Sequence, residues 1–336
     1  MEPHATEGCV LSMTRHSIPD TLDRVDVHPA PAGARERSVA GNLIRSLRPE
    51  QWTKNLIIFA ALLFGERLLD PSAVGSAAAA FAIFCILSGV VYLINDVADR
   101  HADRSHPVKK WRPIASGALP VGTALAAAAV LGGAALAAAF WVRVPLGILA
   151  AAYLGLLALY SGPLKHVVII DVLTIAIGFV LRAAAGAVAI SVPISPWLYV
   201  LTILLALFLA LSKRRHELVL LADRATGHRP ILEEYSPYLL DQMIAVVTAS
   251  TLVGYAIYTV SPDTIQKFGT NLLGLTLPFP LYGIFRYLYL VHQKEGGGSP
   301  SEMLLNDRPL LVCVALWAVV VALIIHGPAR FEALFR

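Results

Sequence analysis

The chain has 336 residues, of which 57% are hydrophobic and only 15% are charged. Soluble domains usually contain about 25% charged residues, so this balance excludes an ordinary soluble domain and indicates a polytopic membrane protein. The net charge of +4 does not indicate a nucleic-acid-binding protein, because most basic residues lie between apolar runs, where they set membrane topology or bind phosphate.

The N-terminal segment differs from the rest of the chain. It is rich in Pro, Arg, Asp, His and Glu and has no apolar periodicity. No apolar run that would suit a secretion signal precedes residue 55, so we expect no cleavable signal. We predict a disordered cytoplasmic tail over residues 1–41 and a single transmembrane catalytic domain over residues 42–336.

Apolar runs fill the remaining sequence and predict an all-α fold, a polytopic membrane helix bundle with about nine transmembrane helices. The expected spans are 53–69, 72–95, 119–141, 145–161, 167–190, 196–212, 241–260, 269–291 and 309–326.

Basic residues orient these spans, because positive charges remain on the cytoplasmic side. The segments after the even-numbered spans carry Arg100, Arg104, Lys109, Lys110, Arg112, Lys165, Lys213, Arg214, Arg215, Arg224, Arg229, Lys294 and Arg308. The opposite connections carry only Arg67, Arg143 and Lys267. We therefore expect a multi-pass protein of a bacterial-type inner (cytoplasmic) membrane, with the active site facing the cytoplasm.

A polar cluster, Asn95, Asp96, Asp99 and Asp103, directly follows the second apolar run. On a helix, the three aspartates would share one face, where their negative charges repel one another. Carboxylates at the C-terminal end of a helix also oppose its dipole, and a bound cation removes that penalty. Oxygen ligands suit Mg²⁺, which binds through one or two carboxylates together with substrate phosphates. The cluster predicts a Mg²⁺–diphosphate site.

Basic and aromatic residues follow at the same membrane side. Lys109, Lys110 and Arg112 can contact phosphate oxygens that the metal leaves free, and arginine offers a bidentate fork. Tyr160 and Lys165 end the fourth run and are candidates for contacting a phosphate or a ribose hydroxyl. The alternatives are membrane topology for the first three residues and interface anchoring for the last two.

Asp171 and Arg182 are charged residues inside the fifth apolar run. Charges within a membrane are costly and usually face a cavity or a partner. Eleven positions separate the two, about three helical turns, so they share a face without touching. Pairing with other helices and contact with substrate both remain open.

A basic run, Lys213, Arg214 and Arg215, follows the sixth span, with Glu217 four residues after Lys213. We interpret it as a second phosphate-binding locus that faces the aspartates. The alternatives are a cytoplasmic stop signal and a helical ion pair between Lys213 and Glu217. His101 and His106 are expected at the surface rather than in a metal site.

These motifs resemble the UbiA superfamily of intramembrane prenyltransferases. Residues 95–103 are similar to its NDxxDxxxD motif, and residues 112–117 are similar to its RPxxSG segment. The resemblance covers residues 43–326 and implies nine helices around a central cavity. Further segments are similar to the branch that moves phosphoribosyl groups onto decaprenyl phosphate, namely residues 48–55, 106–109, 164–166 and 212–218.

The chain departs from the aromatic prenyltransferases of this superfamily after the sixth span. Those enzymes carry a second aspartate-rich motif there, whereas this chain has the basic residues 213–215. A cationic second locus suits a phosphorylated acceptor. Asp223 lies nearby and is a candidate remnant of the second motif.

The resemblance implies a Mg²⁺-dependent phosphoribosyltransferase. It would transfer 5-phosphoribosyl from phosphoribosyl pyrophosphate to a polyprenyl (decaprenyl) phosphate and release diphosphate. Asp96, Asp99 and Asp103 would be catalytic and, with Asn95, would bind the metal. The expected substrate-binding residues are Lys54, Asn95, Lys109, Lys110, Arg112, Tyr160, Lys165, Arg182, Lys213, Arg214, Arg215 and Glu217. The bilayer is an expected partner, nucleic acid is not, and the sequence is compatible with an oligomer.

Two other functions remain open from the sequence. The same aspartate site would serve a prenyl diphosphate donor and an aromatic or other small acceptor, although the missing second aspartate motif weighs against this. A non-catalytic lipid-phosphate transporter or scaffold is compatible with the charges inside the spans. Acidic residues beside phosphate-binding cations fit catalysis better.

Overall fold

The computed structural model describes residues 38–106, 108–222, 234–294 and 300–334. Every regular element in these ranges is helical, which confirms the all-α prediction. The predicted tail lies outside the described residues up to residue 37. The first helix, α1 (Val39–Ser46), begins before the boundary expected at residue 42.

Seven helices are long and apolar enough to cross a membrane, so the chain is a multi-pass membrane protein. They are α3 (Pro71–Ala98), α5 (Val121–Val142), α6 (Val144–Ser161), α7 (Ile170–Ala189), α8 (Pro196–Ala222), α9 (Pro237–Val260) and α13 (Arg308–Leu334). The clearest difference from the expected bounds is in α8. It continues to residue 222 instead of ending at residue 212, so the basic run lies on a helix rather than in a loop.

The expected first span is not one long α-helix. Residues 53–64 fall on a 3₁₀-helix, η1 (Pro49–Phe59), and on the short α2 (Ala60–Phe64), and residues 65–69 follow without regular helix. A 3₁₀-helix rises about 2.0 Å per residue against about 1.5 Å in an α-helix. The two segments together therefore extend about 30 Å, the thickness of a hydrocarbon core, with fewer residues than an α-helix needs.

The expected span 269–291 is also divided. It contains the 3₁₀-helix η5 (Leu272–Thr276) and the 16-residue α11 (Pro278–Gln293). Pro278 begins the α-helix because proline lacks the N–H group that the first turn leaves unpaired. The count of nine long spans is thus not confirmed among the described helices.

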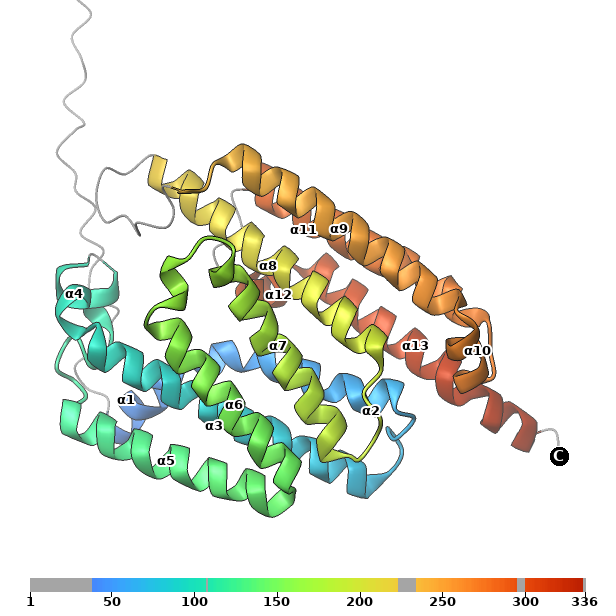
Figure 1. The fold of residues 1–336 in the computed structure, drawn as a ribbon, viewed down its shortest axis with the longest axis horizontal. Coiled ribbons are helices and arrows are strands. Elements are labelled where there is room, and N and C mark those ends of the chain that lie inside the picture. Colours follow the sequence, from blue (N-terminus) through green and yellow to red (C-terminus); the bar gives the residue numbers. More distant parts are fainter. Residues whose placement is uncertain (1–37, 107, 223–233, 295–299, 335–336) are drawn as a thin grey trace, which may run out of the picture. The chain divides into compact units, whose positions relative to one another are not determined.

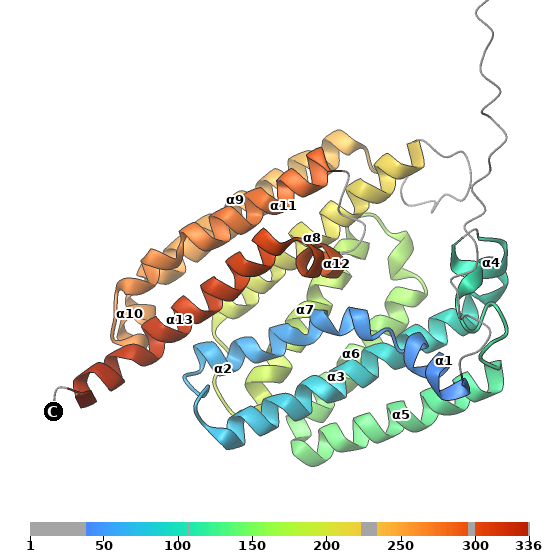
Figure 2. The same ribbon diagram turned by 180° about the vertical axis from the view of Figure 1, so that it is seen from behind.

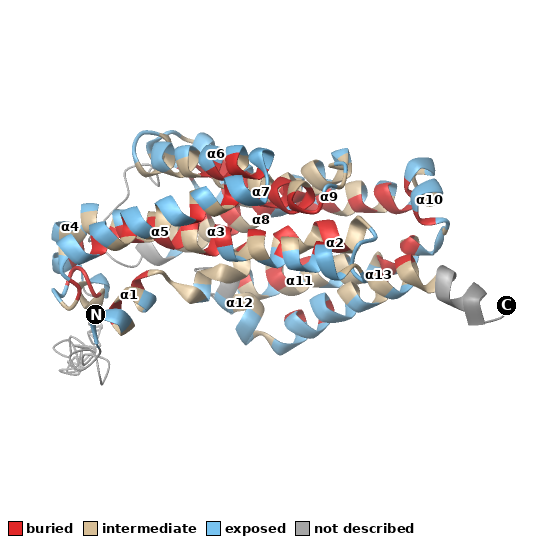
Figure 3. Cartoon of the chain, turned by 90° about the horizontal axis from the view of Figure 1, so that it is seen from below, coloured by how far each residue is buried: buried red, intermediate tan, exposed pale blue. Residues whose placement is uncertain are grey.

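α3 and α7 form the centre of the bundle. α3 packs against α5, α6 and η1, and α7 packs against α6, α8 and η1. Buried residues follow α3 and α7, whereas α5 and α13 are mostly exposed (Figure 3). In the apolar stretch of α7, 61% of the residues are buried, compared with 17% in α5. α5 thus presents apolar side chains outward, as a lipid-facing helix does.

The contact between α7 and η1 depends on Gly186. A Cβ atom at Gly186 would lie 2.1 Å from the carbonyl oxygen of Ile58, so no side chain fits there. This close approach holds η1 against the bundle centre. It allows the buried Asn55 of η1 to reach side chains of neighbouring helices.

The polar connections gather at one end of the bundle. The connection after α3 contains α4 (Arg100–Ser105) and η2 (Lys109–Trp111), and η3 (Leu164–His166) joins α6 to α7. Figures 1 and 2 show α4 and the end of α8 at this end, and α10 (Pro262–Phe268) at the other. A short helix, α12 (Pro300–Asn306), precedes α13. The aspartate segment and the basic run therefore share one end, as predicted.

Candidate active site at the polar end of the bundle

The aspartate segment bends at Asp99. α3 ends at Ala98, and Asp99, with φ −85° and ψ 1°, connects it to α4. The expected single helical face is therefore interrupted. Asp96 and Asp103 are each 3% exposed, whereas Asp99 is exposed and Asn95 is half-buried. The structure thus buries two of the three predicted carboxylates together and leaves the third at the entrance.

Arg112 joins the two buried carboxylates. Its Nη1 atom donates to Asp96 Oδ1 at 3.1 Å and to Asp103 Oδ2 at 2.7 Å. Among the described residues, no three acidic, histidine or cysteine side chains gather as a metal site. Two carboxylate oxygens that converge on one cationic nitrogen nevertheless fit Mg²⁺, because the ion takes its other ligands from water and substrate phosphates.

Arg48 also contacts Asp96, and the sequence analysis did not single it out as a site residue. Its Nη2 atom donates to Asp96 Oδ1 at 2.5 Å, and its guanidinium carbon lies 4.5 Å from the centre of the Tyr92 ring. Its backbone adopts φ 52°, which is uncommon for a residue other than glycine. Pro49, which follows it and begins η1, is the only local sequence signal for this turn.

The connection between α4 and η2 is organised by His106. Its Nδ1 atom accepts the backbone N–H groups of Val108 and Lys109, both at 3.2 Å. Burial and the positive charge of Lys109 lower the pKa of His106, which favours this neutral acceptor form. Lys109 itself is exposed, and the Lys110 ammonium lies 5.2 Å from the Trp111 ring centre. Neither lysine forms an ion pair with a described residue.

Arg182 is buried deep in the bundle and has neutral partners. It donates to Asn55 Oδ1 at 2.7 Å and to the Tyr153 hydroxyl at 2.5 Å, and it stacks on the rings of Tyr153 and Phe179. The intramembrane cation thus pairs with other segments, one of the two expected alternatives. Among the described residues, its hydrogen-bond partners carry no negative charge.

Two lysines extend this positive region toward the aspartates. Lys54 interacts electrostatically with Arg182 and Arg48, and Lys213 interacts with Lys54 and Tyr92. Lys213 has one carboxylate neighbour, Glu217, at 3.8 Å. We refer to Lys54, Arg182 and Lys213 as the interior cation group.

The basic run on α8 is not a single locus. Successive residues of an α-helix point about 100° apart; Lys213 and Arg214 both contact Glu217, whereas Arg215 points to another helix. Lys213 interacts electrostatically with Lys54, whereas Arg214 donates to Asp171 at 2.8 Å. Arg215 donates to Asp241 on α9 at 2.5 Å. The three cations, expected to form one locus, are therefore divided: Arg215 bonds to α9 and is separate from Lys213 and Arg214.

Arg214 belongs to a closed network around Asp171. It also donates to Glu217 at 2.5 Å and to the Tyr160 hydroxyl at 3.0 Å. Tyr160, which is expected to contact substrate, thus accepts a hydrogen bond from Arg214. Asp171 is 0% exposed, and its second hydrogen bond comes from Tyr235.

Tyr235 was missed by the sequence analysis because no pattern marks it. Its hydroxyl donates to Asp171 Oδ1 at 2.9 Å and accepts the N–H group of Ile169 at 2.7 Å. Burial raises the pKa of Tyr235 to about 12, so the hydroxyl stays protonated and keeps donating. Ile169 has φ 68°, a rare conformation for a β-branched residue. Lys165, in the adjoining η3, is half-buried, and Asp223 lies outside the described residues.

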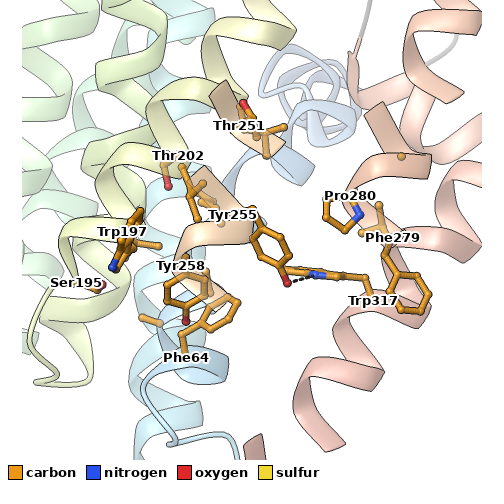
Figure 4. Close-up of a pocket in the computed structure, with 18 of the residues that line it drawn as sticks. Phe64, Ser195, Trp197, Thr202, Thr251, Tyr255, Tyr258, Phe279, Pro280 and Trp317 are labelled. Carbon is orange, nitrogen blue, oxygen red and sulfur yellow. Dashed lines mark hydrogen bonds between the residues drawn. The ribbon is translucent and has the colours of Figure 1, made fainter. Parts of the chain in front are cut away.

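An apolar cavity of about 570 Å³ lies between α2, α8, α9, α11 and α13. Figure 4 shows Phe64, Trp197, Tyr258 and Trp317 among the side chains that line it. Few polar groups line it: the Tyr255 hydroxyl is paired with Thr276 at 2.6 Å and accepts from Trp317 Nε1 at 2.9 Å, and the buried Tyr287 hydroxyl has no hydrogen-bond partner among the described residues. The cavity thus suits an apolar chain rather than a polar ligand.

Two members of the interior cation group, Lys54 and Lys213, are aligned with residues that line this cavity. Residues three apart in a 3₁₀-helix lie on the same side, so Lys54 is aligned with Ile57, which lines the cavity. Leu209 also lines the cavity, and Lys213 follows it four residues later on the same face of α8, about 6 Å along the helix. The arrangement suits a ligand with an anionic head and a long apolar chain.

Comparisons with known proteins identify the relatives of this chain. The model of the UbiA prenyltransferase family matches residues 56–307. Decaprenyl-phosphate phosphoribosyltransferase of Mycolicibacterium smegmatis is 32% identical over 85% of this chain and 93% of its own length. The enzyme of the same name from Corynebacterium glutamicum is 31% identical over 86% of this chain and 88% of its own length. The structure of a UbiA homolog from Archaeoglobus fulgidus bound to GPP and Mg²⁺ has a TM-score of 0.65 at 18% identity and covers 85% of this chain and 99% of that one.

Proposed function

Because this chain belongs to the UbiA prenyltransferase family, a family of membrane transferases, we propose that it transfers 5-phosphoribosyl from phosphoribosyl pyrophosphate to a polyprenyl phosphate, with decaprenyl phosphate as the expected acceptor. One observation carries the proposal. Lys54 lies on the same side of η1 as Ile57, which lines the apolar cavity, and it interacts electrostatically with Arg48, which contacts Asp96. Two phosphorylated substrates need two such loci, one acidic with a metal and one cationic.

The aspartate locus would bind the donor diphosphate. Asp96 and Asp103 would hold Mg²⁺, with Asp99 and Asn95 at the entrance as further oxygen donors. When bound, Mg²⁺ neutralises the negative charge that grows on the departing diphosphate. Arg112 lies between the two carboxylates and would contact diphosphate oxygens, and Lys109 and Lys110 would approach from the connection after α4.

The cationic locus would bind the acceptor phosphate. Lys54 and Lys213 come from opposite segments, η1 and α8, and repel each other without an anion between them. Arg182 adds a positive field from deeper in the bundle. The prenyl chain would extend into the apolar cavity, which removes its surface from contact with water.

The chemistry then requires little beyond positioning. An oxygen of the acceptor phosphate attacks ribose C1 while the bond from C1 to the diphosphate oxygen breaks, and diphosphate leaves with the electron pair. The acceptor oxygen is already anionic at neutral pH, so no side chain has to remove a proton. The lysines orient that oxygen toward C1, which converts an encounter in solution into a reaction within one complex.

The positive residues at this end of the bundle favour a cytoplasmic orientation. The soluble, charged donor would then enter from the cytoplasm, and the lipid acceptor would enter from the bilayer. We place the protein in the inner membrane of a bacterial cell on this basis. The two decaprenyl-phosphate phosphoribosyltransferases that this chain is similar to come from bacteria, which supports the placement.

A product assay separates this reaction from prenyl transfer. Purified full-length protein with Mg²⁺ is incubated with phosphoribosyl pyrophosphate and polyprenyl phosphates of several lengths, and separately with prenyl diphosphates and aromatic acceptors. Mass spectrometry is expected to detect a polyprenyl-phosphate phosphoribosyl adduct in the first mixture only. Prenylated aromatic product with no ribosyl adduct would establish the alternative, and lipid-phosphate binding without any product would favour a transporter or scaffold.

A further inference from the structure

We infer that Arg48 and Arg112 occupy the aspartate oxygens in the ligand-free enzyme and move to the diphosphate when the metal takes those oxygens. The inference rests on the aspartate locus of the proposed function but not on the group that the donor carries. A prenyl diphosphate and phosphoribosyl pyrophosphate would drive the same exchange. Arg48 thereby becomes a further substrate-positioning residue.

Arg48, Arg112 and a bound metal would compete for the same carboxylate oxygen of Asp96. Asp96 Oδ1 accepts from Arg48 at 2.5 Å and from Arg112 at 3.1 Å. Asp103 Oδ2 accepts from the same nitrogen of Arg112 at 2.7 Å. A metal ligated at about 2.1 Å by these oxygens leaves no room for both guanidinium groups at their present positions. The arginines and the metal therefore exclude each other at these oxygens.

Both arginines are partly exposed to water at the edge of the site. Their side chains are 23% and 27% exposed, although Asp96 is only 3% exposed. Arg214, which bonds an equally buried aspartate, is 3% exposed and is enclosed by its partners. An arginine at the edge of a buried carboxylate can turn toward an incoming anion without opening the bundle.

The ring of Tyr92 gives the Arg48 guanidinium a fixed surface against which it can reorient. Tyr92 precedes Asp96 by one helical turn, and its ring lies 4.5 Å from the Arg48 guanidinium carbon. Stacking on an aromatic face leaves the N–H groups at the guanidinium edge available for a planar, bidentate contact with phosphate. The backbone of Arg48, at φ 52°, is also held in a left-handed conformation that fixes where the side chain begins.

The exchange predicts opposite effects of one substitution on two ligands. Arg48→Gln removes a cation that competes with the metal, so the metal alone binds more tightly. It also removes a cation that binds phosphate, so a diphosphate without metal binds more weakly. A purely structural role would weaken both ligands, and a role in phosphate binding alone would leave the metal unaffected.

The experiment uses the purified full-length protein. Mn²⁺, which accepts the same oxygen ligands as Mg²⁺, is titrated alone and followed by electron paramagnetic resonance. Methylenediphosphonate is titrated in the presence of a chelator and followed by calorimetry. Arg48→Gln is expected to bind Mn²⁺ about fivefold to tenfold more tightly and methylenediphosphonate about fivefold to tenfold more weakly, the lower range of couplings between sites.

Two further variants make the result interpretable. Arg67→Gln breaks an exposed arginine–aspartate pair (3.0 Å to Asp70) at the opposite end of α3 and is expected to change neither affinity. Arg48→Lys retains the positive charge and is expected to bind Mn²⁺ within about twofold of the unsubstituted protein. Mn²⁺ affinity that is unchanged or lower in Arg48→Gln, or equally raised in Arg48→Lys, would overturn the exchange. Neither outcome decides which acceptor the enzyme uses.

Discussion

Two networks in this protein place a buried aspartate against arginines, and they differ in how the arginines are enclosed. In the mouth network, Arg48 and Arg112 contact Asp96 and are 23% and 27% exposed. In the frame network, Arg214 contacts Asp171 and is 3% exposed. The carboxylates are equally hidden in both. We therefore expect the exposure of the cation to distinguish a network that receives a ligand from one that holds the fold.

The frame network joins segments that lie far apart in sequence. Asp171 begins α7, Arg214 lies on α8, Tyr160 ends α6, and Tyr235 precedes α9. Breaking a buried pair leaves an uncompensated charge, which is far more costly than the net contribution of the pair. The network thereby fixes the end of α8 that carries Lys213, and we expect it to support the site through the fold.

The largest expected effect is at the mouth network. Asp96→Asn keeps the size of the side chain but removes the negative charge that would hold Mg²⁺. We expect the rate of transfer to fall by about a hundredfold to a thousandfold, as when one group that stabilises developing charge is removed. Initial rates at saturating Mg²⁺ measure the loss of transfer. Thermal unfolding in detergent measures any change in stability.

The stability of Asp96→Asn is expected to change little, because the two arginines it releases are already partly exposed to water. Wild-type-like turnover in this variant would disprove the assignment of the metal site. If the Asp96→Asn protein fails to fold, Asp96 has a structural role like that of Asp171, and the distinction between the mouth network and the frame network is wrong.

The next effect is expected in the frame network and on stability rather than rate. Asp171→Asn leaves Arg214 buried with only Glu217 as a charged partner, and we expect a loss of about 3–5 kcal/mol in the free energy of unfolding. Tyr235→Phe removes only one hydrogen bond to Asp171 and serves as the milder matched variant, at about 1 kcal/mol. Denaturation in detergent, followed by tryptophan fluorescence, measures both.

The rate per folded molecule tests whether the frame network is structural. It should fall far less in Asp171→Asn than in Asp96→Asn. A stable Asp171→Asn protein that has lost its activity would show instead that this network contacts substrate.

A smaller effect is expected at the interior cation group. Lys54→Gln and Lys213→Gln each remove one charged donor from the proposed acceptor phosphate. We expect the KM for polyprenyl phosphate to rise about tenfold, because a hydrogen bond to a charged group contributes about 1.5–3 kcal/mol. The KM for phosphoribosyl pyrophosphate should change much less. If the donor KM rises instead, these lysines bind the donor and the two loci are assigned the wrong way round.

Much of the fold could be predicted from the sequence because long apolar runs have few alternatives in a membrane. The helices α3, α5, α6 and α7 lie close to the expected spans, and the polar connections share one end. The segment 49–64 could not be predicted as a 3₁₀-helix followed by a short α-helix, because hydropathy reports length in residues rather than rise per residue.

The candidate site was predictable in residue type but not in grouping. The aspartates were correctly placed at the polar end, yet the bend at Asp99 separates one from the other two. Arg48 and Tyr235 lie 48 and 64 positions from the aspartates that they contact, and no local pattern marks such distant partners. Charge balance inside a bundle depends on packing, which composition alone does not specify.

The smallest expected effect concerns Arg215, the third residue of the basic run. It bonds Asp241 at 2.5 Å, and that carboxylate is 37% exposed and also contacts His292 at 3.2 Å. Ion pairs that water can reach contribute about 0–1 kcal/mol, so Arg215→Gln should lower the free energy of unfolding by less than about 1 kcal/mol. Because Arg215 faces α9 rather than the interior cation group, we expect the KM for each substrate to stay within about twofold.

Arg215→Gln and Lys213→Gln form a matched pair, since they remove one charge each from positions two residues apart on the same helix. Measuring the KM for polyprenyl phosphate in both variants tests whether the helix separates their roles. A tenfold rise in only Lys213→Gln would support a locus that uses one face of α8. Equal rises would show that the run acts as one cationic locus in the working enzyme, which would require the end of α8 to turn when substrate binds.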